Sequence, residues 1–283
     1  MNSVTYCFGR YVAVGDGGLG LSSADGVTWT KASPLLEGVL RGVAASPTQA
    51  VAVGDQSNLQ TSANALTWKA GSGMGAGNIW RVIYHNGRFV AAMDGGVGFS
   101  DSGRIWRAKG IGGVAYSVIG QGSLLLAMGS GDSASQPAVF RSTDGGDNWS
   151  RTIPPGSGYL AGVAYGNGVY VALGQFGAAF SSIDAIHWTA RTSGTSSAIY
   201  DVAFGNNVFV ATIAGSTSVL VSPNGTNWTL QATGLSGTYD SIVFRDGLFH
   251  AAGTRIATSP DGIAWADHGS PSALLIGVEK ALG

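Results

Sequence analysis

The sequence predicts an all-β protein, a single seven-bladed β-propeller built from four-stranded antiparallel blades. Three observations predict it: tryptophans recur at a spacing near 40 residues, the repeats show no helical periodicity, and the composition disfavours helices. Only four lysines and two glutamates occur in 283 residues, and helix surfaces draw heavily on both residue types. Self-similarity at a period of about 40 residues is typical of propellers and solenoids.

Seven short segments carry the repeat, each running from a serine to a tryptophan. They read SADGVTW (23–29), SANALTW (62–68), SDSGRIW (100–106), STDGGDNW (142–149), SIDAIHW (182–188), SPNGTNW (222–228) and SPDGIAW (259–265). The tryptophans are separated by 39, 38, 43, 39, 40 and 37 residues. A second pattern precedes each segment, as in VAYGNGVYVALG (163–174). The chain is therefore predicted to contain seven copies of one structural unit.

Each repeat divides into four short segments rich in β-branched and aromatic residues, separated by turn residues. In the fifth repeat these segments are 163–165, 170–173, 178–182 and 187–191. Radial packing of four-stranded sheets covers both faces of each sheet and leaves short edges; a linear β-solenoid is the alternative, but its strands repeat over shorter periods. Within a propeller spanning 1–271, the expected blades are 3–34, 40–72, 79–110, 115–155, 160–194, 199–234 and 239–270.

Two segments compete for the first strand of the first blade. The N-terminal copy offers the apolar pair Val4 and Tyr6, whereas the C-terminal copy offers Val278 and Lys280. The apolar pair favours the N-terminal copy. Residues 272–283 are then a C-terminal tail that pairs elsewhere, docks on another subunit or forms a short helix; the alternative is that they supply the closing strand.

The serine-to-tryptophan segments resemble the Asp-box (BNR) repeats of sialidases and related propellers. Segment 142–149 has the full family spacing, and the other six are one residue shorter. The resemblance implies a structural role: polar side chains bond within a hairpin, glycine provides the turn, and the tryptophan packs between blades, away from the ligand face. The residues given this role are Asp25, Trp29, Asn64, Trp68, Trp106, Asp144, Trp149, Asp184, Trp188, Asn224, Trp228, Asp261 and Trp265.

The sialidase activity is not expected to accompany this resemblance. Sialidases use an arginine cluster, a tyrosine nucleophile paired with a glutamate, and an acidic aspartate, but neither Glu37 nor Glu279 lies beside a matching tyrosine. Xyloglucanase-type hydrolases place paired aspartates between two tandem propellers, and one propeller is predicted here. We therefore expect no catalytic residues; the alternative is a glycoside hydrolase that uses an Asp/Asp pair from Asp16, Asp55 and Asp94, although Gly-Asp is also an ordinary turn sequence.

The resemblance to Asp-box propellers implies that ligands bind on the face that carries the loops between blades, which the second-to-third-strand turns share. Aromatic residues with Arg and Asp neighbours recur just before the first strand of successive blades, which suits sugars; the alternative is that the aromatic rings fill gaps between blades. The candidate ligand-binding residues are Asp16, Arg41, Asp55, Trp80, Arg81, Asp94, Tyr116, Tyr200, Asp201 and Tyr239.

The bulk composition narrows the classes of partner. A net charge of −1 with 11% charged residues favours neither nucleic acid nor an anionic membrane. No apolar run approaches the roughly 20 residues that span a bilayer, and no secretory signal is visible at the N-terminus. Cys7 is the single cysteine, and His85, His187, His250 and His268 fall in separate repeats. We expect no internal disulfide, no metal site and no cofactor.

A low-charge sequence rich in Gly, Ser, Ala and Thr resembles bacteriophage virion components, among which propellers occur in tail and receptor-binding proteins. This resemblance implies a non-catalytic tail or fibre component that binds a host surface glycan or another virion protein. The alternatives are a bacterial lectin-like or assembly-factor propeller, and the glycoside hydrolase above. A homo-oligomer, or docking through the C-terminal tail, is also considered.

Overall fold

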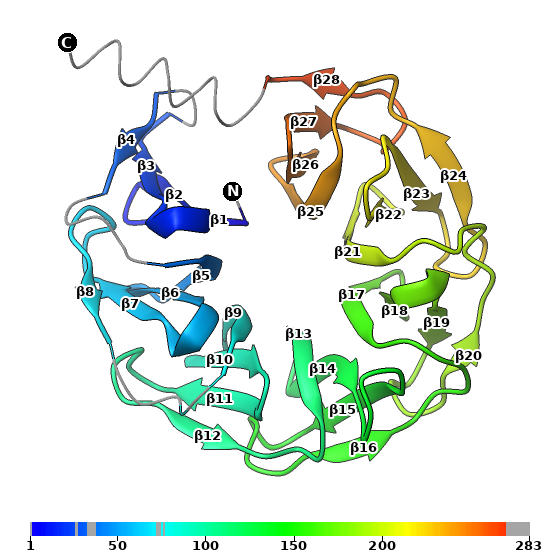
Figure 1. Ribbon diagram of the computed structural model, residues 1–283, viewed down its shortest axis with the longest axis horizontal. Helices are drawn as coiled ribbons and strands as arrows, with labels where there is room; N and C mark the ends of the chain where they lie inside the picture. The colour runs from blue at the N-terminus through cyan, green and yellow to red at the C-terminus, as the bar shows by residue number, and fades with distance from the viewer. Residues whose placement is uncertain (1, 26–27, 33–37, 72–74, 76, 270–283) are drawn as a thin grey trace. The chain divides into compact units, whose positions relative to one another are not determined.

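The structure is a computed structural model that describes residues 2–25, 28–32, 38–71, 75 and 77–269. Over these residues the chain is a seven-bladed β-propeller of four-stranded antiparallel sheets, as the sequence predicts (Figure 1). Each sheet is formed by four consecutive strands in sequence order. The described part of the chain contains no helix long and apolar enough to cross a membrane.

The chain divides into two units, which are described separately. The described residues of the first unit come from Met1–Leu125 and Ser142–Trp149, and those of the second come from Leu126–Arg141 and Ser150–Pro271. Blades one to three belong to the first unit and blades five to seven to the second, while blade four has strands in both.

The described residues of the first three blades form twelve strands and two single-turn 3-10 helices. The strands are β1 (Ser3–Cys7), β2 (Arg10–Val14), β3 (Gly20–Ser23), β4 (Thr30–Lys31), β5 (Leu40–Ala45), β6 (Ala50–Gly54), β7 (Leu59–Ser62), β8 (Lys69–Ala70), β9 (Ile79–His85), β10 (Arg88–Met93), β11 (Gly96–Ser100) and β12 (Arg107–Lys109). The short helices are η1 (Asp16–Gly18) and η2 (Asp55–Ser57). Blade four is β13 (Val114–Gln121), β14 (Leu124–Ser130), β15 (Pro137–Ser142) and β16 (Ser150–Thr152).

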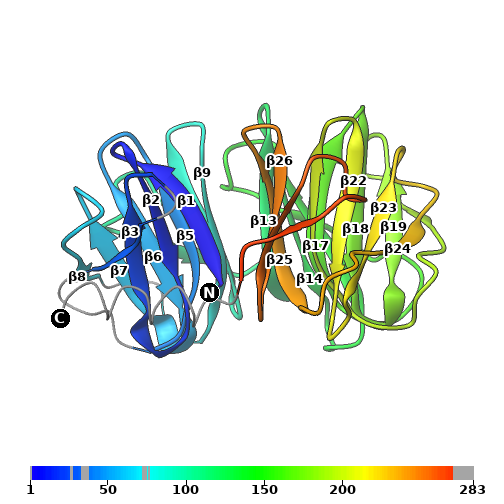
Figure 2. The same ribbon diagram turned by 90° about the horizontal axis from the view of Figure 1, so that it is seen from above.

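The last three blades repeat the pattern. Their strands are β17 (Leu160–Gly166), β18 (Val169–Gly174), β19 (Ala179–Ser182), β20 (Thr189–Ala190), β21 (Ile199–Gly205), β22 (Val208–Ile213), β23 (Ser218–Ser222), β24 (Thr229–Ala232), β25 (Tyr239–Arg245), β26 (Leu248–Gly253), β27 (Ile256–Ser259) and β28 (Ala266–Asp267). A third short helix, η3 (Gln175–Gly177), joins β18 to β19. Figure 2 shows β22 and β23 side by side, as their antiparallel pairing requires.

The core of each unit lies between neighbouring sheets. In the first unit, Val51 and Val53 of blade two pack with Val82 and Trp106 of blade three. In the second unit, the equivalent cluster joins residues of blade five, such as Val171, to residues of blade six. Burial of each such side chain contributes about 1.5–3 kcal/mol. A blade therefore depends on its neighbours for stability, which is why one sequence pattern recurs along the chain.

The N-terminal segment forms the first strand of blade one. β1 pairs with β2 from Ser3 opposite Val14 to Cys7 opposite Arg10, which is the arrangement that the sequence favours. The proposed tail, residues 272–283, lies outside the described residues, and so do both glutamates, Glu37 and Glu279.

The hairpins between the third and fourth strands, here called the tryptophan hairpins, bond within themselves. The Ser142 hydroxyl donates to Asp144 at 2.8 Å, and the Asn148 amide N–H donates to the same carboxylate oxygen at 2.9 Å. This bond from the Asn148 backbone, with a second from its side chain, holds the pKa of Asp144 at about 2. The same pattern recurs in the hairpins of blades two and six, where Asn64 and Asn224 accept with an amide oxygen instead.

Candidate functional site

A β-bulge sits at the start of most blades and defines the candidate site. In blade two, Leu40 pairs with Gly54 and Gly42 pairs with Val53, so Arg41 between them is an extra residue. A bulge of this kind re-aims the side chain of the unpaired residue. The same register shift isolates Trp80, Ala161, Tyr200 and Asp240 in blades three, five, six and seven. We call this place the bulge position.

In the first unit, the residue at the bulge position bonds an aspartate 14 residues further along the chain. Arg41 donates from Nε and Nη2 to both carboxylate oxygens of Asp55, the second bond at 2.9 Å. Trp80 donates its indole N–H to Asp94 at 2.7 Å. In blade one, Asn2 stands at the matching place and donates to Asp16 at 2.8 Å. In each of these three blades, therefore, a side-chain donor bonds an aspartate that lies 14 residues later in the sequence.

The backbone of the turn brings each pair together. In blade two the Asp55 amide donates to the Val39 carbonyl at 3.0 Å, which joins the turn to the strand entry. The turn passes so close that a β-carbon on Gly54 would lie 1.8 Å from the Val39 oxygen. In blade three the second carboxylate oxygen of Asp94 accepts from the Asn78 amide at 2.8 Å. The aspartates are thus held by the backbone next to the bulge.

These pairs join into one row across blades two to four. The Arg41 guanidinium lies over the Trp80 ring, 4.5 Å from its centroid, which is the distance of a cation–π contact. The Trp80 ring meets Tyr116 edge-on, with centroids 5.4 Å apart, a favoured aromatic geometry. We call Asp55, Arg41, Trp80, Asp94 and Tyr116 the aromatic–charged row. All five residues belong to the first unit.

The aromatic–charged row is only partly exposed. The Arg41 side chain is 34% exposed and that of Asp55 26%, and Trp80, Asp94 and Tyr116 are also half-buried. Arg41 and Asp55 balance each other's charge. The row therefore presents ring edges and faces together with fixed donors and acceptors, and the Asp94 carboxylate, which accepts from Trp80 and the Asn78 amide, adds a negative charge.

Asp16 and Arg81 lie beside the row rather than in it. Asp16 is exposed and pairs with Asn2 in blade one. Arg81 follows the bulge position and donates to the Ser117 hydroxyl of blade four at 3.4 Å. Ser3, at the place in blade one that matches Arg81, accepts from the Val43 amide at 3.2 Å. The residue after the bulge thus links neighbouring blades.

The three candidates in the second unit are placed differently. Tyr200 is 40% exposed. Asp201 is only 4% exposed, and its carboxylate accepts from the Ile242 amide at 3.2 Å, which ties blade six to blade seven. Tyr239 is 1% exposed and its ring stacks on Trp265. Tyr239 pairs at the register that Leu40 has in blade two, and the strand alternation directs that position into the core.

Sequence reasoning missed Asn2 and Asn78. Asn2 has the same separation from Asp16 as Arg41 has from Asp55, but an alignment of repeats that starts at Val4 leaves Asn2 out. Asn78 bonds Asp94 through its backbone amide, and no side-chain pattern reveals such a bond. The constant separation of 14 residues is the signal that finds the first of them.

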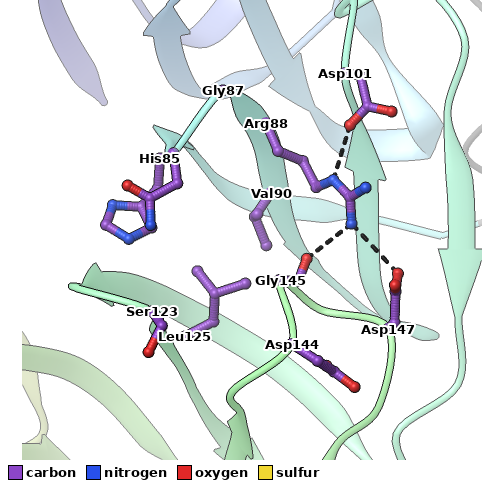
Figure 3. Close-up of a pocket in the computed structure, with 11 residues that line it drawn as sticks. His85, Gly87, Arg88, Val90, Asp101, Ser123, Leu125, Asp144, Gly145 and Asp147 are labelled. Carbon is purple, nitrogen blue, oxygen red and sulfur yellow. Dashed lines mark hydrogen bonds and ion pairs between the residues drawn. The ribbon is translucent and has the colours of Figure 1, made fainter.

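A separate pocket of about 280 Å³ lies at the other end of the strands of the first unit, among hairpins of blades three and four (Figure 3). Arg88 crosses it and donates to Asp101 at 2.8 Å, to the Gly145 carbonyl at 2.9 Å and to Asp147 at 3.3 Å. In Figure 3 the apolar side chains of Val90 and Leu125 face the interior. The Arg88 guanidinium holds the tryptophan hairpin 142–149 against blade three. We therefore interpret the pocket as a structural contact between blades three and four.

Comparison with known proteins places the fold among propellers. No protein-family model and no curated protein matches the sequence. Among solved structures, YCF48 from Cyanidioschyzon merolae matches with a TM-score of 0.69 at 16% identity, over 88% of this chain and 91% of that one. The GH74 xyloglucanase from Xanthomonas campestris matches with a TM-score of 0.70 at 13% identity, over 92% of this chain and 52% of that one.

A virginiamycin B lyase from Staphylococcus aureus is also similar, with a TM-score of 0.68 at 10% identity over 82% and 84% of the two chains. Likeness at these identities shows the fold alone. The similar structures include enzymes and also a computationally designed protein, Ika8. They therefore do not decide whether this propeller is catalytic.

Proposed function

We propose that the chain is a non-catalytic binding propeller that holds a glycan on the aromatic–charged row. One observation carries this proposal: blades five and six form the same bulge with Ala161 and Tyr200, where blades two and three have Arg41 and Trp80. The bulge therefore forms without those charged and aromatic side chains. Their accumulation in one sector supports a role in recognition.

The chemistry of the row suits a sugar. A pyranose ring has apolar C–H faces that pack on aromatic rings, and hydroxyl groups that pair with charged donors and acceptors. Trp80 and Tyr116 supply the rings, and Arg41 with Asp55 supplies a fixed donor and acceptor pair. Because this pair is held before a ligand arrives, little conformational entropy is lost on binding.

The hydrogen bonds of the carboxylates support binding rather than hydrolysis. Glycoside cleavage requires two carboxyl groups about 5–10 Å apart, one of which donates a proton. Asp55 accepts from Arg41 with both oxygens, and Asp94 accepts from Trp80 and the Asn78 amide. Each carboxylate thus acts as an acceptor that orients its neighbours.

We further propose that the tryptophan hairpins are Asp-box repeats and that the protein is a phage tail or fibre component. The first assignment is supported by the Ser142–Asp144 bond and by the spacing from Ser142 to Trp149. The second is supported by composition, with 46 glycines and 11% charged residues. A bacterial lectin-like or assembly-factor propeller is the alternative setting for the same binding role.

A second candidate ligand for the aromatic–charged row is a polypeptide segment. A structure of YCF48 bound to a D1 peptide is similar to this chain, with a TM-score of 0.52 at 14% identity. An Arg–Asp pair beside aromatic rings also suits a peptide, since aromatic and arginine side chains dominate protein interfaces. In this reading the partner is another virion protein or a client of assembly.

The proposal is tested with a glycan array and a reducing-sugar assay on the full chain. Arg41→Ala gives blade two the residue that blade five has naturally, and we expect it to lower glycan binding at least tenfold. Thr254→Ala is the control, because Thr254 stands 14 residues after the bulge position of blade seven, where blade two has Asp55, and is not part of the aromatic–charged row. It should leave binding within twofold of the wild type.

The possible results separate the glycan-binding, hydrolase and peptide-binding functions. Sugar release that Asp55→Asn abolishes would contradict a non-catalytic role and establish the glycoside hydrolase. Peptide binding lost in Arg41→Ala, with no glycan bound, would favour the second candidate. If Arg41→Ala weakened the binding of no glycan on the array, the aromatic–charged row would not be the site.

A further inference from the structure

The η3 turn of blade five carries a phenylalanine in a backbone conformation that glycine favours. Phe176 has φ 59°, in the left-handed region, and the residue is 60% exposed. In blade one the matching residue is Gly17, with φ 65°, and in blade two it is Gln56, with φ 53°. A bulky residue in this region is strained, and burial offsets little of that strain because most of the residue is exposed.

The turn holds Phe176 in place. The Gln175 amide donates to the Tyr159 carbonyl at 2.9 Å, and the Ser193 hydroxyl donates to the Gly177 carbonyl at 2.8 Å. A β-carbon on Gly177 would lie 1.9 Å from the Thr195 oxygen, so the turn fits tightly against its neighbour. The exposed ring is therefore presented on a fixed backbone, as preorganised binding groups are.

A second exposed ring lies on the strand next to this turn. η3 lies against β21, whose bulge residue is Tyr200, and Tyr200 is 40% exposed. In the first unit, Arg41 covers the matching ring of Trp80 from the preceding blade. Blade five has Ala161 at the place of Arg41, and a methyl group leaves the tyrosine ring accessible.

The next strand adds a carboxylate. β25 packs against β21, and its bulge residue is Asp240, which is exposed. The η3 turn and residues 192–200 contain no charged side chain and are rich in serine and threonine. Two aromatic rings, one carboxylate and neighbouring hydroxyl groups are the groups that recognise an uncharged sugar, through its C–H face and a pair of its hydroxyls.

We propose that Phe176, Tyr200 and Asp240 form a second carbohydrate subsite, specific for neutral sugars, on the second unit. It shares no residue with the aromatic–charged row, so either site can exist without the other. The strain at Phe176 is the cost of presenting its ring to the ligand.

The strain makes a sharp test possible. Binding of the full chain is measured on an immobilised panel of neutral glucose-, galactose- and mannose-containing oligosaccharides, together with thermal unfolding. Phe176→Gly relieves the backbone and removes the ring, so we expect the Tm to rise by about 2 °C while binding falls at least tenfold. Phe176→Ala removes the ring and keeps the strained φ, so it should lose binding without the gain in Tm.

Gln56→Gly is the control, because Gln56 has the same backbone conformation in the turn of blade two. It should raise the Tm similarly and leave binding to the neutral panel within twofold. Tyr200→Ala and Asp240→Asn should each weaken binding, whereas Trp80→Ala should not.

Four results would overturn the subsite: no panel sugar bound by the wild type, binding retained in Phe176→Gly, a Tm that falls in Phe176→Gly, or neutral-sugar binding lost in Trp80→Ala alone. The last would move neutral-sugar binding to the aromatic–charged row. Weaker binding of array glycans outside the neutral panel in Arg41→Ala, with the neutral panel unaffected, supports two separate sites.

Discussion

The two units share one backbone feature, a bulge followed by a short turn, but they carry different side chains on it. Blades two and five both have a bulge, then a one-turn 3-10 helix between the second and third strands. In the first unit the paired residues are Asn2 with Asp16, Arg41 with Asp55, and Trp80 with Asp94. In the second unit the matching residues are Ala161 and Gln175, Tyr200 and Ala214, and Asp240 and Thr254.

This difference separates what builds a blade from what a blade can bind. The shared features are apolar strand residues and glycines at points of close approach, whereas the polar pairs are confined to the first unit. A repeat protein contains its own controls, because a residue that one blade lacks is not required to fold a blade. Function is then expected from the residues that differ between blades, and not from the strands and turns that all blades share. We call these shared strands and turns the frame.

The largest expected effect concerns the shared frame. A β-carbon on Gly54 would lie 1.8 Å from the Val39 oxygen, and one on Gly174 would lie 2.0 Å from the Tyr159 oxygen. Gly54→Ala and Gly174→Ala should therefore each lower the free energy of unfolding by about 2–3 kcal/mol, measured by urea denaturation. Both residues have extended φ values, so the effect comes from the clash alone.

Gly110→Ala provides the control, since a β-carbon there meets nothing closer than 4.0 Å. It should change the free energy of unfolding by less than about 0.5 kcal/mol. If Gly174→Ala were as harmless as Gly110→Ala while Gly54→Ala was not, the two units would not share one turn frame.

A smaller effect is expected from the Arg41–Asp55 pair. The pair is bidentate but about a third exposed, so a double-mutant cycle with Arg41→Ala and Asp55→Ala should give a coupling of about 0.5–1 kcal/mol. Ala161→Arg with Gln175→Asp installs the pair in blade five. The shared backbone predicts a similar coupling there.

A coupling near zero in blade five would show that the pair needs Trp80 beneath the guanidinium as well as the turn. That result would restrict the comparison: the backbone would be common to both units, but the ability to form the pair would not.

The sequence predicts the fold well because its strongest signals are local and repeated. The tryptophan spacing, the strand alternation and the turn residues each occur seven times, so a degenerate copy does not obscure the pattern. The sequence also selects Arg41, Trp80 and Tyr116 of the aromatic–charged row as candidates, because they stand at one place relative to the first strand. Their contacts were not found, since they depend on a register shift of one residue that the sequence does not mark.

Two residues show what pattern alone leaves open. Tyr239 was grouped with surface aromatics by its distance along the chain, yet the strand alternation turns it inward onto Trp265. Phe176 stands where blades one and two have Gly17 and Gln56, and only the backbone conformation reveals that its position is strained. Both depend on φ and register, which are set by packing between blades.

The smallest effect concerns the opposite end of the strands, where the two units are alike. Bonds from Asn148 hold the pKa of Asp144 at about 2 in the first unit, and bonds from the Ala264 and Ile263 amides lower the pKa of Asp261 in the second. An unfolded aspartate has a pKa of about 3.9. A lowered folded pKa stabilises the protein above that value, and the stability is lost as the pH falls from about 4 through about 2.

Asp144→Asn and Asp261→Asn should therefore leave the Tm at pH 7 nearly unchanged and reduce its fall between pH 4 and pH 2, since Asn64 and Asn224 make the same bonds without titrating. Asn224→Asp should enlarge the fall. Thermal melting across that pH range measures each variant. If the Tm responded in only one unit, the tryptophan hairpins would differ between the units, as the turns at the other end of the strands do. The hairpins would then not belong to the structure that all blades share.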